Sequence, residues 1–133
     1  MTSQIEQEGD INHAQLGAGN MAEIRQPDGN QLLAGITQHG AVNRATVDQR
    51  GANHDALVFQ GGTDNLAAVD QNGAVGGSFA DIAQTGNGNQ AAVTQSAQAG
   101  GGPNMTSISQ AGNGFMASVN QVGAANSMTV VQR

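Results

Sequence analysis

The residues whose spacing could support chemistry are glutamines, because eleven of them return along the chain at an almost constant interval. They are Gln15, Gln26, Gln38, Gln49, Gln60, Gln71, Gln84, Gln95, Gln110, Gln121 and Gln132. The interval is mostly 11 residues, with slips of 12, 13 and 15. A primary amide carries no charge, but it donates two hydrogen bonds and accepts two. A periodic row of amides therefore predicts bonding between repeated units rather than one reactive pocket.

Other residue types that could support catalysis or metal binding are scattered. His13 and His54 stand at positions expected to face inward and His39 is expected in a turn, so the three differ in phase. The chain has no cysteine, and no close cluster of histidine and carboxylate has ligand spacing. Asp48 and Asp70 are expected to stack on neighbouring units, but a solvated charged face explains them equally well. We therefore expect no metal site and no enzyme activity, although sequence alone does not exclude a Ser/His/Asp triad.

Three stretches resemble a nucleotide-binding fingerprint. They match Gly-x-Gly-x-x-Ala and begin at Gly17, Gly86 and Gly112. A dinucleotide site needs this motif between a strand and a helix, with an acidic residue further on. Here the motif recurs at one phase of the repeat and leads into another strand, so we predict no cofactor.

The residues before each glutamine predict β-strands. Asn43, Ala45 and Val47 lie six, four and two residues before Gln49, and most units repeat this order with similar residues. A period of two places these four side chains on one face of a strand. Charged residues in the strands occupy the alternate positions, as expected if the glutamine face is buried. Asparagines are expected to form amide ladders together with the glutamines; they are Asn20, Asn43, Asn65, Asn89, Asn104 and Asn126.

A glycine two residues after the glutamine predicts a turn in most units, because glycine readily adopts the positive φ of a tight reversal. These turn glycines are Gly17, Gly40, Gly51, Gly73, Gly86, Gly112 and Gly123. The two prolines, Pro27 and Pro103, fall between strands, where the missing N–H does least harm.

Composition narrows the protein class. The 133 residues include 3 Phe, no Trp and no Lys, with a net charge of −6, so the core must be thin and nucleic-acid binding is disfavoured. No run of 18 apolar residues is present, which argues against membrane insertion. No apolar secretory segment follows Met1, as expected for a processed chain with an added methionine or for a chain without a signal.

These features predict an all-β fold with one domain over residues 1–133. Each strand and turn takes about 11 residues, and two such units make one coil of about 22 residues in a two-sheet β-solenoid. About five to six coils spaced about 4.8 Å apart would stand roughly 25–30 Å tall. Residues 1–10 form an irregular first unit, because the repeat phase slips between Gln7 and Gln15.

Neither end of the predicted solenoid has a capping element. A bare end coil exposes unpaired N–H and C=O groups and offers them to another strand. The expected subunit edges carry Ile5, Gln7, Met128, Val130 and Gln132. Contacts of this open, head-to-tail kind produce a filament, here a cross-β fibre.

The repeats resemble the curlin repeat of the curli subunits, which are secreted functional amyloids of bacterial biofilms. The family unit reads roughly Ser-x5-Gln-x-Gly-x-Gly-Asn-x-Ala-x3-Gln. It is matched by Ser78-x5-Gln84-Thr85-Gly86-Asn87-Gly88-Asn89-Gln90-Ala91-x3-Gln95. The departures include His54 and Phe115 at asparagine positions, more repeats than the familiar five, and few aromatic residues.

The resemblance implies a secreted protein that is exported through an outer-membrane channel and assembles with itself into extracellular fibres at the cell surface. It also implies a nucleator subunit as partner. We expect a main fibre subunit, because the last repeat is regular and uncharged until Arg133. The alternatives are the nucleator itself, or a monomeric β-solenoid that serves as a binding or adhesion module.

Overall fold

The computed structural model describes residues 2–7, 11–27, 29–74 and 76–133, with side chains from residue 17 onward within these ranges. All regular elements in this part of the chain are β-strands, with no helix. They are β1 (Thr2–Gln7), β2 (Ile11–Leu16), β3 (Met21–Gln26), β4 (Gly29–Asn30), β5 (Leu33–Ala41), β6 (Arg44–Ala52), β7 (His54–Thr63), β8 (Leu66–Gly73), β9 (Ser78–Asn87), β10 (Gln90–Ala97), β11 (Asn104–Asn113), β12 (Met116–Gly123) and β13 (Ser127–Gln132).

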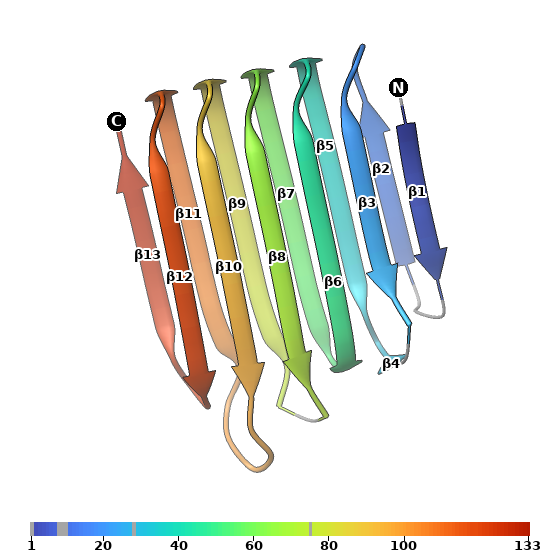
Figure 1. Cartoon of the computed structure of the whole chain (residues 1–133). Helices are drawn as coiled ribbons and strands as arrows, with labels where there is room; N and C mark the ends of the chain where they lie inside the picture. Colours follow the sequence, from blue (N-terminus) through green and yellow to red (C-terminus); the bar gives the residue numbers. More distant parts are fainter. Residues whose placement is uncertain (1, 8–10, 28, 75) are drawn as a thin grey trace.

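The strands alternate between two stacked parallel sheets (Figure 1). Sheet A has the order β1-β3-β6-β8-β10-β12, with the short β4 paired to β6, and sheet B has the order β2-β5-β7-β9-β11-β13. Each coil gives one strand to each sheet, so that Gln49 on β6 lies opposite Gln71 on β8, 22 residues later. This topology confirms the two-sheet β-solenoid predicted from the repeat.

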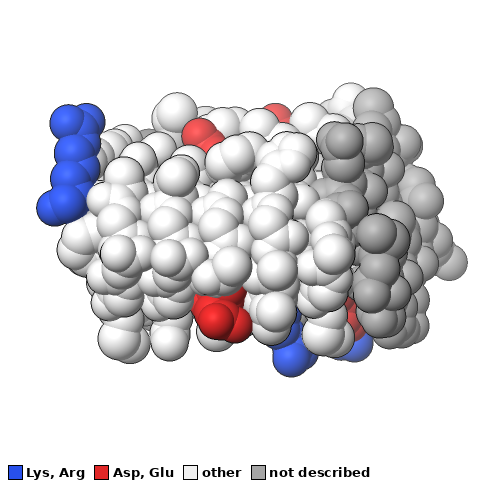
Figure 2. All heavy atoms as spheres, turned by 90° about the horizontal axis from the view of Figure 1, so that it is seen from above, with Lys and Arg blue, Asp and Glu red and all other residues white. Residues whose placement is uncertain are grey.

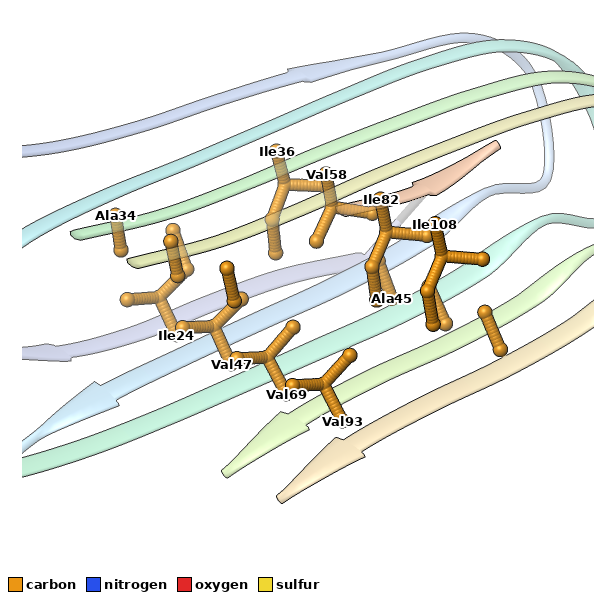
Figure 3. Packing of buried hydrophobic residues seen from close by; sticks show 14 of the residues in the cluster. Ile24, Ala34, Ile36, Ala45, Val47, Val58, Val69, Ile82, Val93 and Ile108 are labelled. Atoms are coloured by element: carbon orange, nitrogen blue, oxygen red, sulfur yellow. The ribbon is translucent and has the colours of Figure 1, made fainter. Parts of the chain in front are cut away.

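A thin aliphatic core fills the space between the sheets (Figure 3). One row comes from sheet A and consists of Ile24, Val47, Val69 and Val93, and the facing row from sheet B consists of Ile36, Val58, Ile82 and Ile108. All eight side chains are at most 3 % exposed. Full burial of a side chain of this size contributes roughly 1.5–3 kcal/mol, so the rows stabilise the stack although aromatic residues are few.

The strands run further than predicted, because the glycine-containing segments that follow the glutamines keep the ladder pairing between coils. We call these curved segments glycine arcs. Gly40 pairs with Gly62, and His39, expected in a turn, pairs with Gly61 as part of β5. At Gly40, with φ of 98°, a Cβ atom would lie 2.0 Å from the backbone oxygen of Gly62. Stacked arcs of this kind therefore require glycine both for the positive φ and for the close approach.

The turn glycines divide into two kinds. Positive φ is found at Gly40, Gly51, Gly86, Gly112 and Gly123. The expectation of positive φ is wrong at Gly17 and Gly73, which are absent from this group. There a Cβ atom would meet backbone instead, at 2.7 Å from the oxygen of Gly40 and 2.8 Å from that of Ala97. At these two positions glycine is needed for close packing between coils, not for its conformational freedom.

The first coil departs from the expected register in sheet B. On β1, Gln7 pairs with Gln26 as the repeat requires, although residues 8–10 of the expected irregular unit lie outside the described residues. On β2, Gln15 pairs with Thr37, and Leu16 takes the position opposite Gln38. The prediction that Gln15 continues the glutamine register is therefore wrong.

The shift on β2 changes which residues pair with those of β5. It pairs Ala14 with Ile36 and His13 with Gly35, whereas the expected register would have paired His13 with Ile36. The side chain of His13 lies outside the described residues, so its inward position stays a prediction.

Candidate assembly site

Two ladders of glutamine side chains run along the solenoid between the sheets. In sheet A, Nε2 of each glutamine donates to Oε1 of the next through Gln26, Gln49, Gln71, Gln95 and Gln121. In sheet B the same bonds join Gln38, Gln60, Gln84, Gln110 and Gln132. From Gln49 to Gln121 the bonds are 2.7–2.9 Å long, and the sheet B bonds span the same range.

The same amides also join the two sheets to each other. Nε2 of Gln49 on β6 donates to the backbone oxygen of Leu33 on β5 at 3.0 Å. Nε2 of Gln60 on β7 donates in the opposite direction, to the backbone oxygen of Arg44 on β6 at 3.1 Å. A carboxylate would lack these donors and a leucine would leave the carbonyl groups unpaired, so glutamine is the side chain that fits the position.

The predicted asparagines form a second, shorter set of ladders at the start of the strands. Oδ1 of Asn43 accepts from the backbone N–H of Asn65 at 3.0 Å, and Asn20, Asn43, Asn65 and Asn89 repeat this bond along sheet A. The row ends when Oδ1 of Asn89 accepts from the backbone N–H of Phe115. In sheet B, Oδ1 of Asn104 accepts from both nitrogens of Asn126.

Two sets of polar contacts that the repeat did not predict also join the strands. The hydroxyl of Thr106 on β11 accepts from Gln95 at 3.0 Å and donates to Gln121 at 2.9 Å, which links sheet B to the sheet A ladder. Outside the core, Oδ1 of Asn87 accepts from the N–H and the hydroxyl of Thr63 in the turns. Thr106 stands where β5, β7 and β9 carry alanine, and that exception in the sequence could have signalled it.

The glutamine ladders have a direction, because donation always runs toward the C-terminal end. Within the described residues, Oε1 of Gln26 and of Gln38 is buried without a hydrogen-bond partner. At the other end, Nε2 of Gln121 and of Gln132 donates to the backbone oxygens of Met105 and Met116. Among the described residues, no further coil follows to which either of these glutamines could donate.

The C-terminal coil is also incompletely covered. Ala117 and Val130 pack against the core but remain partly exposed, whereas their counterparts Ala91 and Ile108 are at most 3 % exposed. Met128, predicted at a subunit edge, is 44 % exposed. This end of the solenoid therefore presents both apolar and amide groups along the stacking direction.

Each end of the solenoid has two edge strands rather than one. Ile5 and Gln7 lie on β1 at the edge of sheet A, and Val130 and Gln132 lie with Met128 on β13 at the edge of sheet B. The other two edges, β2 and β12, were not among the expected residues. They follow from the two-strand coil, since every end must finish both sheets.

Most charged side chains of the described residues lie on the outer faces of the sheets. Figure 2 shows them in separate groups with uncharged surface between them. Asp48 and Asp70 are register partners, as expected, and Arg50 pairs with Asp48 at 2.8 Å. Burial raises the pKa of Asp81 above its ordinary value.

Among the described residues, no group of three or more histidine and carboxylate side chains is placed to hold a metal ion.

These features define a parallel two-sheet β-solenoid with internal amide ladders and edge strands at both ends of each sheet. Residues 40–73 match the family model of the Curlin associated repeat, which confirms the resemblance of the repeats to curlin. No curated protein matches the chain. Within the described part of the chain, no helix is long and apolar enough to span a membrane.

Proposed function

We propose that the chain is a structural subunit that joins end to end with copies of itself into an extracellular, curli-like amyloid fibre. The observation that carries the proposal is the order of the edge strands. Sheet A begins with β1 and ends with β12, and sheet B begins with β2 and ends with β13. A second copy stacked on the C-terminal end would therefore continue sheet A with its β1 and sheet B with its β2.

The register of the edges supports this stacking. Gln7 occupies the position of Gln26 in sheet A, so the incoming β1 would bring Gln7 over Gln121 of the preceding copy. The partly exposed Ala117 and Val130 would be covered by the same step. Each joint would add main-chain bonds on two strands and bury the open end of the core, which are the interactions of a cross-β fibre.

The match to the Curlin associated repeat supports the biological setting of this proposal. Secretion to the cell surface, export through a dedicated channel and a nucleator subunit as partner are properties of curli systems, and we propose them for this chain. We also propose that its role is structural rather than catalytic. A main subunit would form fibres alone, whereas a nucleator would chiefly shorten the lag of another subunit.

A monomeric binding module is the second candidate, favoured by one feature of the outer face of sheet A. A shallow groove there is lined by Leu66, Ala68 and Met116, of which Leu66 and Met116 are 40 % and 70 % exposed. Exposed apolar surface of this kind marks binding sites in many proteins.

Sedimentation and electron microscopy of the purified chain separate the two candidates. Polymerisation predicts fibres whose diffraction shows spacings of about 4.8 Å along the axis and about 10 Å between sheets. Fragmented fibres should also remove the lag of fresh protein. A chain that remains a compact monomer over days at micromolar concentration, with no response to seeds, would overturn the proposal and favour the binding module.

A further inference from the structure

His54 is a fully buried titratable side chain in the core, with 0 % exposure. It begins β7 at an asparagine position of the repeat, and its Nε2 lies 3.1 Å from the backbone oxygens of both Arg50 and Gly73. Asn65 makes the same two contacts with Nδ2, to Gly61 at 3.2 Å and Gly86 at 2.9 Å. Since both contacted atoms are acceptors, Nε2 of His54 must carry the proton and act in place of the asparagine amide.

The other ring nitrogen of His54 is unpaired. Its Nδ1 is buried without a hydrogen-bond partner, and so is Oγ of Ser78, which is the register partner of His54 in the next coil. A neutral imidazole tolerates this environment, because Nδ1 is then only an unfilled acceptor facing a small side chain. A proton on Nδ1 would instead place a positive charge inside the stack, away from water.

The surroundings contain little to balance such a charge. Burial lowers the pKa of His54, and this effect outweighs the opposite influence of the Gly73 and Arg50 carbonyls and of the Asp55 carboxylate. The Arg50 side chain is exposed and paired with Asp48, and β8 contributes the uncharged Gly73. On β9, the neighbouring Ser78 is neutral, and Asp81 lies opposite Leu57 rather than His54. On β5, Leu33 pairs with Asp55 and is uncharged.

We propose that His54 makes the folded solenoid acid-sensitive, so that mild acid unfolds or loosens the stack at its middle coils. The unfolded chain takes up a proton on His54 near pH 6.5, while the folded chain resists it. The unfolded state then binds more protons, and stability falls as the pH falls below about 6.5. One proton changes the unfolding equilibrium constant by at most about tenfold per pH unit, and the effect ends where the folded imidazole itself titrates.

The test compares denaturant unfolding of three full-length chains between pH 5 and pH 7.5. His54→Asn keeps the two donated hydrogen bonds but cannot titrate, and His39→Asn changes an exposed histidine as the matched control. All three carry Asp81→Asn, because the raised pKa of Asp81 acts in the opposite direction. We expect the free energy of unfolding to fall in acid for the chain with Asp81→Asn alone and for the chain that also carries His39→Asn. For the chain that also carries His54→Asn, we expect it to stay constant over this pH range. An unchanged acid slope in His54→Asn would overturn the proposal.

A second measurement does not depend on a variant. The imidazole carbon shifts of His54 in the parent chain report its charge and tautomer by nuclear magnetic resonance. At pH 6.5, where a free imidazole is about half charged, we expect mainly the neutral form with the proton on Nε2, and a mainly charged ring at that pH would contradict the proposal. The acid sensitivity of fibre growth rests on the proposed function, but the unfolding comparison does not. A chain that never polymerises would therefore refute the function and leave His54 still tested.

Discussion

Gln49 donates its side-chain amide to Oε1 of Gln71 in the next coil at 2.7 Å, and the same nitrogen donates to the backbone oxygen of Leu33 in the opposite sheet at 3.0 Å. One side chain thus fixes both the spacing between coils and the spacing between sheets. Because these groups are buried, the loss of one amide leaves partners unpaired on three neighbouring strands.

Replacement of a central glutamine by leucine should destabilise the fold. Gln71→Leu removes one of the two acceptors of Gln49 Nε2, and it removes the donor to Oε1 of Gln95 and to the backbone oxygen of Asp55. At about 1–3 kcal/mol for each unpaired group, partly offset by the apolar side chain, we expect a loss of roughly 3 kcal/mol in the free energy of unfolding. Denaturant titration measures this loss. The matched control is Gln90→Leu on the exposed face of β10, and equal stability of the two variants would argue against the ladders.

Alanine in a stacked glycine arc should be more harmful than alanine in an open turn. Gly62 and Gly88 both have positive φ, at 111° and 68°. A Cβ atom at Gly62 would lie 2.0 Å from the backbone oxygen of Gly86, whereas one at Gly88 meets nothing within 4 Å. Gly88→Ala should therefore cost only the left-handed backbone strain of about 1–2 kcal/mol, and Gly62→Ala clearly more. Thermal unfolding of the two variants gives the order, and the reverse order would exclude close stacking of the arcs.

The acidic side chain of Asp81 should lower stability at neutral pH. Burial raises its pKa in the folded chain, so the stability associated with its protonated form is complete below the unfolded value of about 3.8 and is lost as the pH rises through the folded value. Asp81→Asn should therefore raise the free energy of unfolding at pH 7, with the gain disappearing below about pH 3.8. Asp64→Asn in an exposed turn is the control. An equal gain at pH 3 and pH 7 would show that charge is not the cause.

Much of the fold is predictable from the sequence because the stack repeats one local pattern. The alternation around Gln49 and Gln71 determines which face is buried, and identical neighbours in register then require the amides to meet. The same alternation predicts that Asp48 stacks on Asp70, and the two are register partners on β6 and β8. Each residue of a central coil has its equivalent above and below, so a local pattern is sufficient there.

The prediction failed where a residue lacks equivalent neighbours, or where contacts between coils determine the register or the residue type at a position. Gln15 follows the spacing of the repeat, yet the first coil shifts by one residue and pairs it with Thr37. Gly17 and Gly73 are required by backbone contacts that no single repeat shows. Thr106 reaches a ladder of the opposite sheet, and its role depends on how the two sheets are offset.

A site-specific disulfide between copies is the most direct test of the end-to-end joint. Glu6 occupies the sheet A position of Arg25, which continues through Asp48, Asp70 and Thr94 to Asn120 on the last strand. Stacking therefore places Glu6 of one copy opposite Asn120 of the next. Within one chain the two positions lie five coils apart, roughly 24 Å, which is too far for a disulfide.

The measurement is mild oxidation of assembled Glu6→Cys/Asn120→Cys, followed by non-reducing electrophoresis; the chain has no other cysteine. The control, Glu6→Cys/Thr94→Cys, moves the second cysteine to the same face of an interior strand. We predict a ladder of covalent multimers for the first variant and monomers for the control. Monomers alone from both variants, or equal multimers from both, would contradict joining of β12 to β1.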